Sequence, residues 1–98
     1  MADHPIRLVA HRVRFYSVTD EDNFFSWLRR IALIKNVVGQ GDSILIECDS
    51  ALMSDDALRE LIALFFRYDV DTQQLDIFLT DENRSWFMDA KAYWRRGS

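Results

Sequence analysis

Hydrophobic and polar residues alternate along the first part of the chain and then recur at helical spacing. The alternation over Ile6–Val18 predicts either one strand with a buried face or two short strands bent near Ala10–Arg12, and we favour the single strand. Apolar residues then return every three or four positions as far as Val38, which predicts an amphipathic helix that begins at Thr19 and ends at Gly39-Gln40-Gly41. The almost unbroken apolar run Ser43–Cys48 predicts a central strand. The order strand, helix, strand favours a right-handed crossover between two parallel strands.

The second half of the chain predicts further helices. Ser54 is an N-cap residue followed by acids, and the helix that it begins, Ala57–Tyr68, is apolar on nearly all sides. Residues 71–79 alternate as a strand would, but Asp71 followed by Gln74 resembles a capping box, and we favour a short helix. The segment Thr80-Asp81-Glu82-Asn83 predicts the start of a last helix. This last helix carries Trp86, Phe87, Ala90, Tyr93 and Trp94.

Together these elements predict a single small α+β domain. Ninety-eight residues suffice for one hydrophobic core and are too few for two. We expect residues 1–98 to form a sheet of two or three strands, including Val13–Val18 and Ser43–Cys48, packed against three or four helices. We assign no role in the fold to Gly97-Ser98. A hydrophobic fraction of 49% with three glycines and one proline is typical of a folded chain.

Few residues suited to catalysis are present. His4 and His11 are the only histidines, and Cys48 is the only cysteine. An activated nucleophile needs a histidine within reach, and a zinc site needs three or four protein ligands, which this inventory does not readily supply. Cys48 lies in an apolar run, where a thiol packs as a small hydrophobic group. We therefore expect a protein that is not an enzyme and that holds no metal or cofactor.

No sequence feature indicates export or membrane insertion. Residues 1–5 lack the basic and apolar segments of a signal peptide, and no apolar run reaches the roughly 20 residues that a membrane span needs. A lone cysteine cannot form an internal disulfide, as is usual in a reducing cytosol. The expectation is a cytoplasmic protein without membrane contact.

Charge is distributed unevenly along the chain, whose net charge is −4. Residues 1–18 sum to +2 and residues 83–98 to +3, whereas residues 19–82 sum to −9. Nucleic acid is disfavoured as a partner, because neutralising phosphates requires clustered Lys and Arg. An acidic surface instead attracts a basic protein and raises the rate of encounter.

Many of the acids stand where helices are expected to begin. If the two strands are parallel, the residues after Val18 and those after Cys48 emerge at the same edge of the sheet. Three interpretations remain open: helix capping with a solvated rim, a Mg²⁺ or acid–base site, and a docking surface for a basic protein with aromatic anchors. The candidate partner-binding residues are Asp20, Glu21, Asp22, Asp49, Asp55, Asp56, Tyr68, Asp81, Glu82 and Trp86.

The segment Leu58–Tyr68, followed by Trp86-Phe87 and Tyr93-Trp94, resembles small bacterial immunity proteins of contact-dependent growth-inhibition toxin systems. The likeness covers the second half of the chain. It implies a cytosolic, non-catalytic protein that binds the toxic C-terminal domain of a delivered effector, often a nuclease. The acidic residues would then face a basic toxin surface.

Two other functions follow from other features. Ser54-Asp55-Asp56 after the second strand loosely resembles the switch-serine loop of the sulfate-transporter/anti-sigma-antagonist type of domain, although no glycine follows it. The chain would then be a regulatory or scaffold module. If the acidic rim binds Mg²⁺, the chain would instead be a magnesium-dependent enzyme.

Overall fold

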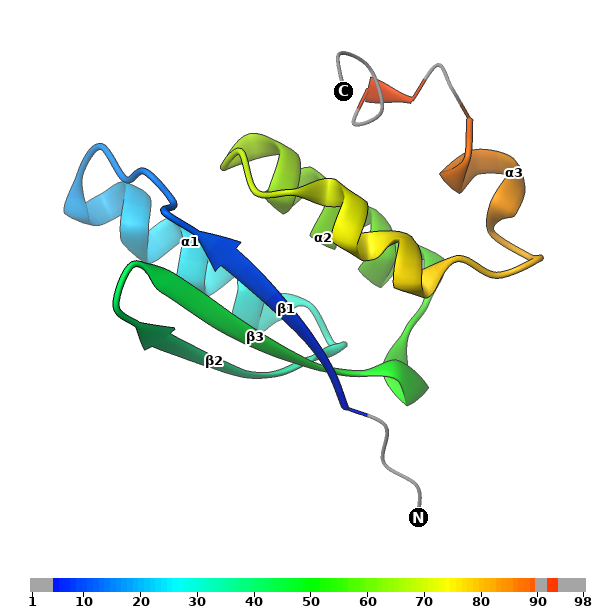
Figure 1. Ribbon diagram of the computed structural model, residues 1–98, viewed down its shortest axis with the longest axis horizontal. Coiled ribbons are helices and arrows are strands. Elements are labelled where there is room, and N and C mark those ends of the chain that lie inside the picture. Colours follow the sequence, from blue (N-terminus) through cyan, green and yellow to red (C-terminus); the bar gives the residue numbers. More distant parts are fainter. Residues whose placement is uncertain (1–4, 90–91, 94–98) are drawn as a thin grey trace.

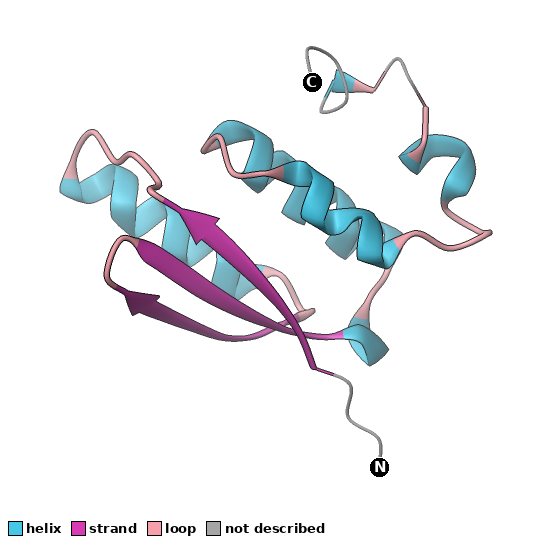
Figure 2. Cartoon of the chain, viewed as in Figure 1, coloured by secondary structure: helices cyan, strands magenta, loops and turns pink. Residues whose placement is uncertain are grey.

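The computed structural model describes residues 5–89 and 92–93, which form a three-stranded antiparallel sheet with helices. The strands are β1 (Pro5–His11), β2 (Ile34–Gln40) and β3 (Ser43–Asp49), in the order β1-β3-β2. The helices are α1 (Val18–Arg30), α2 (Asp55–Arg67) and α3 (Arg84–Phe87), with two 3-10 helices, η1 (Ser50–Leu52) and η2 (Thr72–Phe78). In Figure 1, α1 and α2 run antiparallel to each other, and Figure 2 shows the strands side by side in one sheet. The expected α+β class is confirmed.

One face of the sheet supplies the core. Along β3, Ile44, Ile46 and Cys48 are buried while the residues between them are partly exposed. The register places Leu8 and Ala10 of β1 on this same face, and both are buried. The strands share one hydrophobic cluster with the inward faces of the two long helices, which includes Phe24, Leu28, Leu58, Leu61, Ile62 and Phe65. The helices therefore cover this face of the sheet.

Both long helices begin at a serine N-cap followed by acids. The Ser54 hydroxyl accepts a hydrogen bond from the Ala57 N–H at 3.1 Å, which confirms the predicted start of α2. For α1 the cap is Ser17, whose hydroxyl accepts from the Asp20 N–H at 3.1 Å, and not Thr19 as expected. The acids in both first turns lie at the positive end of a helix dipole.

The first strand ends earlier than its alternation predicts. β1 stops at His11, because Arg12 takes a left-handed backbone conformation with φ 50° and its N–H donates to Asp42 O at 2.8 Å. The strand expected over Val13–Val18 is therefore wrong. Val13 and Phe15 do pack against the core, but from a loop. The alternation of this segment reflects the burial of these two side chains, and the segment does not pair with a neighbouring strand.

The helix expected to extend to Val38 is also wrong beyond Arg30. α1 ends there, and β2 begins at Ile34 and pairs with β3 through a hairpin whose turn includes Gly41 at φ 64°. The glycine segment thus turns a hairpin and does not end a helix. Ile34 and Val38 fit either spacing, and pairing with β3 decides for the strand, where β-branched residues pack well. Both strand pairs are antiparallel, so the predicted parallel crossover is wrong.

Residues after α2 form the expected short helix. The Asp71 carboxylate accepts from the Gln73 N–H at 2.9 Å at the start of η2. Gln74 does not complete a capping box, because its amide reaches across to β1. The last helix is shorter than expected, since α3 has four residues and ends at Phe87. Tyr93 lies after its end, and the expected helical positions Ala90 and Trp94 lie outside the described residues.

Candidate protein-binding surface

Two clefts meet at the C-terminal end of α2. The first, with a volume of about 580 Å³, lies between α1 and α2. The second, with a volume of about 530 Å³, lies between the loop after β1 and the end of α2. Arg67 and Tyr68 line both clefts, to which the first adds Trp27, Arg30 and Glu60 and the second adds Arg12, Arg14, Tyr16, Asp20 and Asp69. The two hollows therefore form one surface that spans three chain segments.

Trp27 joins the two long helices across the first cleft. It is half-buried at the border of the core-facing stripe of α1, and its Nε1–H donates to Glu60 Oε1 of α2 at 2.9 Å. The indole N–H is therefore satisfied within the molecule, while part of the ring remains accessible. Arg30, one turn further along α1, is exposed beside it.

Tyr68 stands where the two clefts meet. Its hydroxyl makes a long hydrogen bond to Asp20 O at 3.4 Å, and its ring packs edge-on against Phe24 with centroids 4.9 Å apart. Burial raises the pKa of the Tyr68 phenol, and Asp20 raises it further, whereas Arg67 opposes the shift. The phenol therefore remains a donor at neutral pH. Of the predicted binding residues, the structure brings Asp20 and Tyr68 together.

Arginine side chains line much of the second cleft. Arg12 Nε lies 3.3 Å from Asp42 Oδ2, in an exposed ion pair. Within the described ranges, no carboxylate forms an ion pair with Arg14 or Arg67. Tyr16 beside them is 81% exposed. This part of the surface offers the guanidinium groups of Arg14 and Arg67 and an aromatic ring, with the carboxylates of Asp20 and Asp69 close by.

Sequence reasoning did not single out Trp27, Arg67 or Tyr16 as binding residues. In the sequence, Trp27 falls at the margin of the apolar stripe of α1, and Tyr16 falls on the polar face of the strand expected over Ile6–Val18, which ends at His11. The only sequence signal for a binding role was an aromatic residue at the border between the apolar and polar faces of an element. Core residues often show the same signal. Only the antiparallel packing of α1 and α2 brings these residues to one surface.

The structure divides the predicted acids among three places. Asp20, Glu21 and Asp22 lie at the start of α1, beside the C-terminal end of α2. Asp55 and Asp56 lie at the other end of α2, roughly 20 Å away for a helix of 13 residues, and Asp49 precedes them at the end of β3. Asp81 and Glu82 lie in the turn before α3. Because the sheet is antiparallel, the chain leaves β1 and β3 at opposite ends, so the expected common edge is wrong.

Basic residues lie between these acidic groups. Arg29 and Arg30 end α1, at the end of the helix pair where α2 begins. Asp81 Oδ1 lies 3.7 Å from Arg84 Nη2, in an exposed pair. The candidate acids therefore do not make one continuous acidic face. Those at the start of α1 are the group that borders the clefts.

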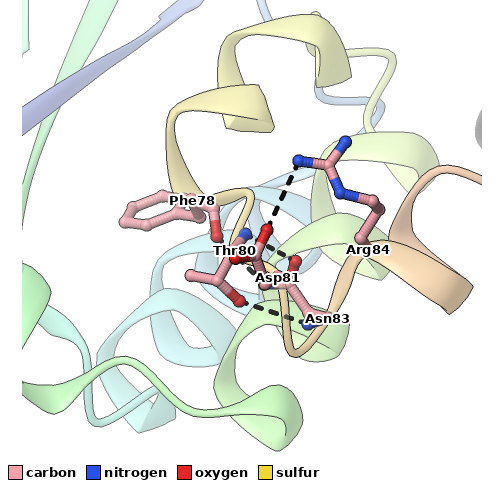
Figure 3. A network of polar contacts seen from close by, with 5 residues as sticks. All are labelled: Phe78, Thr80, Asp81, Asn83 and Arg84. Carbon is pink, nitrogen blue, oxygen red and sulfur yellow. Dashed lines mark hydrogen bonds and ion pairs between the residues drawn. The ribbon is translucent and has the colours of Figure 1, made fainter.

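A buried asparagine holds the turn before α3 (Figure 3). Asn83 is 1% exposed, and its Oδ1 accepts from the Thr80 N–H at 2.8 Å while its Nδ2 donates to Phe78 O at 3.0 Å. The Thr80 hydroxyl accepts in return from the Asn83 N–H at 3.2 Å. This turn positions Trp86, whose ring is half-buried. The Arg59 guanidinium carbon Cζ lies over this ring, 4.0 Å from its centroid. The face of Trp86 is thus occupied by a cation–π contact.

The other residues considered for chemistry, His11 and Ser54, make hydrogen bonds within the fold. His11 Nδ1 lies 2.8 Å from Ser43 Oγ on the adjacent strand. The Ser54 hydroxyl serves as the cap of α2 while the residue itself is exposed. Across residues 5–89 and 92–93, no group of three or more His, Cys, Asp or Glu side chains is arranged to hold a metal ion. In the same ranges no helix has both the length and the apolar character for a membrane span.

Comparisons with protein-family models, curated proteins and solved structures find no match.

Proposed function

We propose that this chain is a cytoplasmic, non-catalytic immunity protein that binds a cognate bacterial toxin domain, a nuclease, and neutralises it. The observation that supports this function is the joined pair of clefts, where Trp27, Tyr68 and Tyr16 lie among arginines. Tryptophan, tyrosine and arginine are the residues that most often dominate the energetics of protein interfaces. Tyr16 in particular exposes most of its ring and is not part of the core.

The acids at the start of α1 would attract basic groups of the partner to the border of these clefts. Glu21 and Asp22 are exposed next to the cleft residue Asn23, so their charge lies within one Debye length, about 8 Å at physiological salt, of a docked partner. Such charges chiefly raise the association rate, and the aromatic anchors determine how long the complex lasts. Asp55 and Asp56 lie at the far end of α2 and have a smaller part in this proposal.

The direct test is to sequence the neighbouring genes and to co-express this chain with any nuclease toxin domain that they encode. We expect restored growth and a complex that survives purification. Tyr16→Ala should weaken the measured affinity by about ten-fold or more, which corresponds to roughly 1.4 kcal/mol. The matched control is Phe66→Ala, because Phe66 is 52% exposed on the same molecule but lies outside the clefts.

Charge variants locate the steering group. Glu21→Gln with Asp22→Asn should lower the association rate and reduce its dependence on salt, while Asp55→Asn with Asp56→Asn should change it less. An unaltered affinity for Tyr16→Ala together with a large loss at the start of α2 would place the interface elsewhere. Failure to protect against any neighbouring toxin domain would remove the proposed function.

A further inference from the structure

The outer edges of the sheet, formed by β1 and β2, differ in how their outward backbone groups are hydrogen-bonded. At the outer edge of β1, the Val9 N–H donates to Gln74 Oε1 at 2.9 Å, and Gln74 Nε2 donates back to Val9 O at 2.9 Å. The side-chain amide of η2 thereby supplies the donor and the acceptor that a neighbouring strand would offer. An edge closed in this way is protected from pairing with another chain.

The outer edge of β2 has no such closure within the described part of the chain. Its only side-chain hydrogen bond there is from Asn36 Nδ2 to Glu47 Oε1, at 3.5 Å, which points inward to β3. The strand has seven residues, five of them exposed, and it forms the border of the sheet opposite β1 (Figure 2). A register irregularity between Ile34 and Asn36 leaves Asn36–Gln40 as the regular part of this edge. Unpaired regular edges are templates for a further strand.

Strand alternation identifies the groups that face outward. Residues opposite each other in an antiparallel pair alternate between exchanging hydrogen bonds and facing away. Val9 directs its N–H and C=O away from β3, so its partner Leu45 directs its own toward β2. Leu45 pairs with Val38, which leaves the N–H and C=O of Val37 and Gly39 on the free edge.

We propose that two copies of this chain associate through β2, antiparallel about a two-fold axis at Val37, to form a continuous six-stranded sheet. In this register Val37 faces the second copy's Val37, and Asn36 faces its Val38. Lys35 is the only charged residue of the strand, and it lies at the irregularity between Ile34 and Asn36, outside the regular segment Asn36–Gln40. The regular segment therefore carries no charge, and no like charges oppose each other within it.

The apolar residues of the sheet also favour a second copy as the occupant. On the face of the sheet away from the helices, the register aligns Val9, Leu45 and Val38 in one row. The row ends at the free edge with Val38, which is 44% exposed. In the proposed pairing the two Val38 side chains are diagonal neighbours, so the rows of the two copies meet across the axis and cover each other.

The test is sedimentation velocity of the full chain over a wide range of protein concentration. The wild type should show a mass that rises toward that of two chains. Val37→Pro should stay at the mass of one chain with an unchanged circular dichroism spectrum, because it removes an outward N–H and leaves the bonds to β3 intact. The matched control is Val9→Pro, the same substitution at the closed edge, which should associate as the wild type does.

A second variant covers the case in which Val37→Pro does not fold. Val38→Lys changes an exposed side chain, keeps the backbone donors and brings two like charges together at the axis, so association should weaken and recover in high salt. A wild type that stays a single chain at every concentration overturns the proposal. So does a dimer that forms equally well in folded Val37→Pro and in Val38→Lys, because it would use another surface.

Discussion

At the scale of single residues, the backbone is strained at the residue that follows the C-cap of α2. The Val70 N–H donates to Phe65 O at 2.8 Å and the Asp69 N–H donates to Phe66 O at 3.3 Å, which is the hydrogen-bond pattern of a Schellman C-cap. Asp69 has a φ of 61° in this motif, a left-handed conformation in which a Cβ costs about 1–2 kcal/mol. Glycine is the usual residue at this position, because it has no Cβ.

Asp69→Gly should therefore raise the free energy of unfolding by about 0.5–1 kcal/mol, because the relief of strain exceeds the added freedom of the unfolded chain. Urea denaturation measures the change. The control is Asp71→Gly, which replaces a residue at φ −58° and removes the hydrogen bond to the Gln73 N–H, and which should destabilise the protein. If Asp69→Gly also destabilises, the Asp69 side chain makes a contribution larger than its strain.

A second residue-scale consequence concerns Cys48. Its side chain is fully buried, and burial raises the pKa of the thiol from 9.0 to about 12. The folded protein therefore holds this proton more tightly than the unfolded chain does. The resulting stability is complete below pH 9 and is lost as the pH rises toward 12, at about 1.4 kcal/mol per pH unit.

We expect Cys48 to be inert to thiol reagents at neutral pH until the protein unfolds. In alkaline solution the wild type should lose stability faster than Cys48→Ala, which is less stable at neutral pH because of its cavity but has no thiol to titrate. Urea unfolding of both proteins across this pH range isolates the thiol, since Tyr68 and Tyr93 are common to both. Parallel pH profiles for the two proteins would contradict the assignment.

At the scale of elements, the contact between η2 and β1 depends on one side chain. Gln74 is half-buried and bridges the Val9 N–H and C=O, and its Nε2 also donates to Asp71 O at 2.9 Å. Sixty-five residues separate the two partners, so this contact also joins the start of the chain to the segment after α2.

Gln74→Ala should lower the free energy of unfolding by about 1–3 kcal/mol, because part-buried backbone groups lose their partners. The Val9 amide should also exchange its hydrogen faster. The matched control is Gln73→Ala, since Gln73 is exposed and makes no side-chain hydrogen bond to the described part of the chain. Equal stabilities for the two variants would show that water replaces the Gln74 amide at no cost.

At the scale of the whole molecule, the antiparallel sheet separates the two proposed interaction surfaces. The clefts open where the start of α1 meets the end of α2, whereas the free edge belongs to β2. The proposed dimer contacts and the proposed toxin contacts share no residue. Each surface can therefore be disabled without the other.

Val37→Pro should thus abolish self-association and keep the affinity for the toxin domain, whereas Tyr16→Ala should weaken that affinity and leave self-association unchanged. Sedimentation and calorimetry on both variants measure the two effects independently. A single variant that abolishes both activities while remaining folded would show that the surfaces are coupled.

Residue patterns alone determined a considerable part of this protein. The α+β class, the central strand β3, the start of α2 at Ser54 and the short helix after Asp71 are local properties, since an apolar run or a capping side chain acts within a few residues. The burial of Cys48 follows from its place in the same apolar run. Among the candidate binding residues, Asp20 and Tyr68 do lie together.

Tertiary structure decided the remainder. Ile34 and Val38 suit a helix or a strand, and only pairing with β3 makes them a strand and turns the expected parallel sheet into an antiparallel one. Because β1 and β3 are antiparallel, the chain leaves them at opposite ends of the sheet. The acids that follow these two strands, which the sequence placed at one edge, are therefore far apart in space. The clefts and the open edge of β2 depend on packing between segments far apart in sequence, and no local periodicity encodes such contacts.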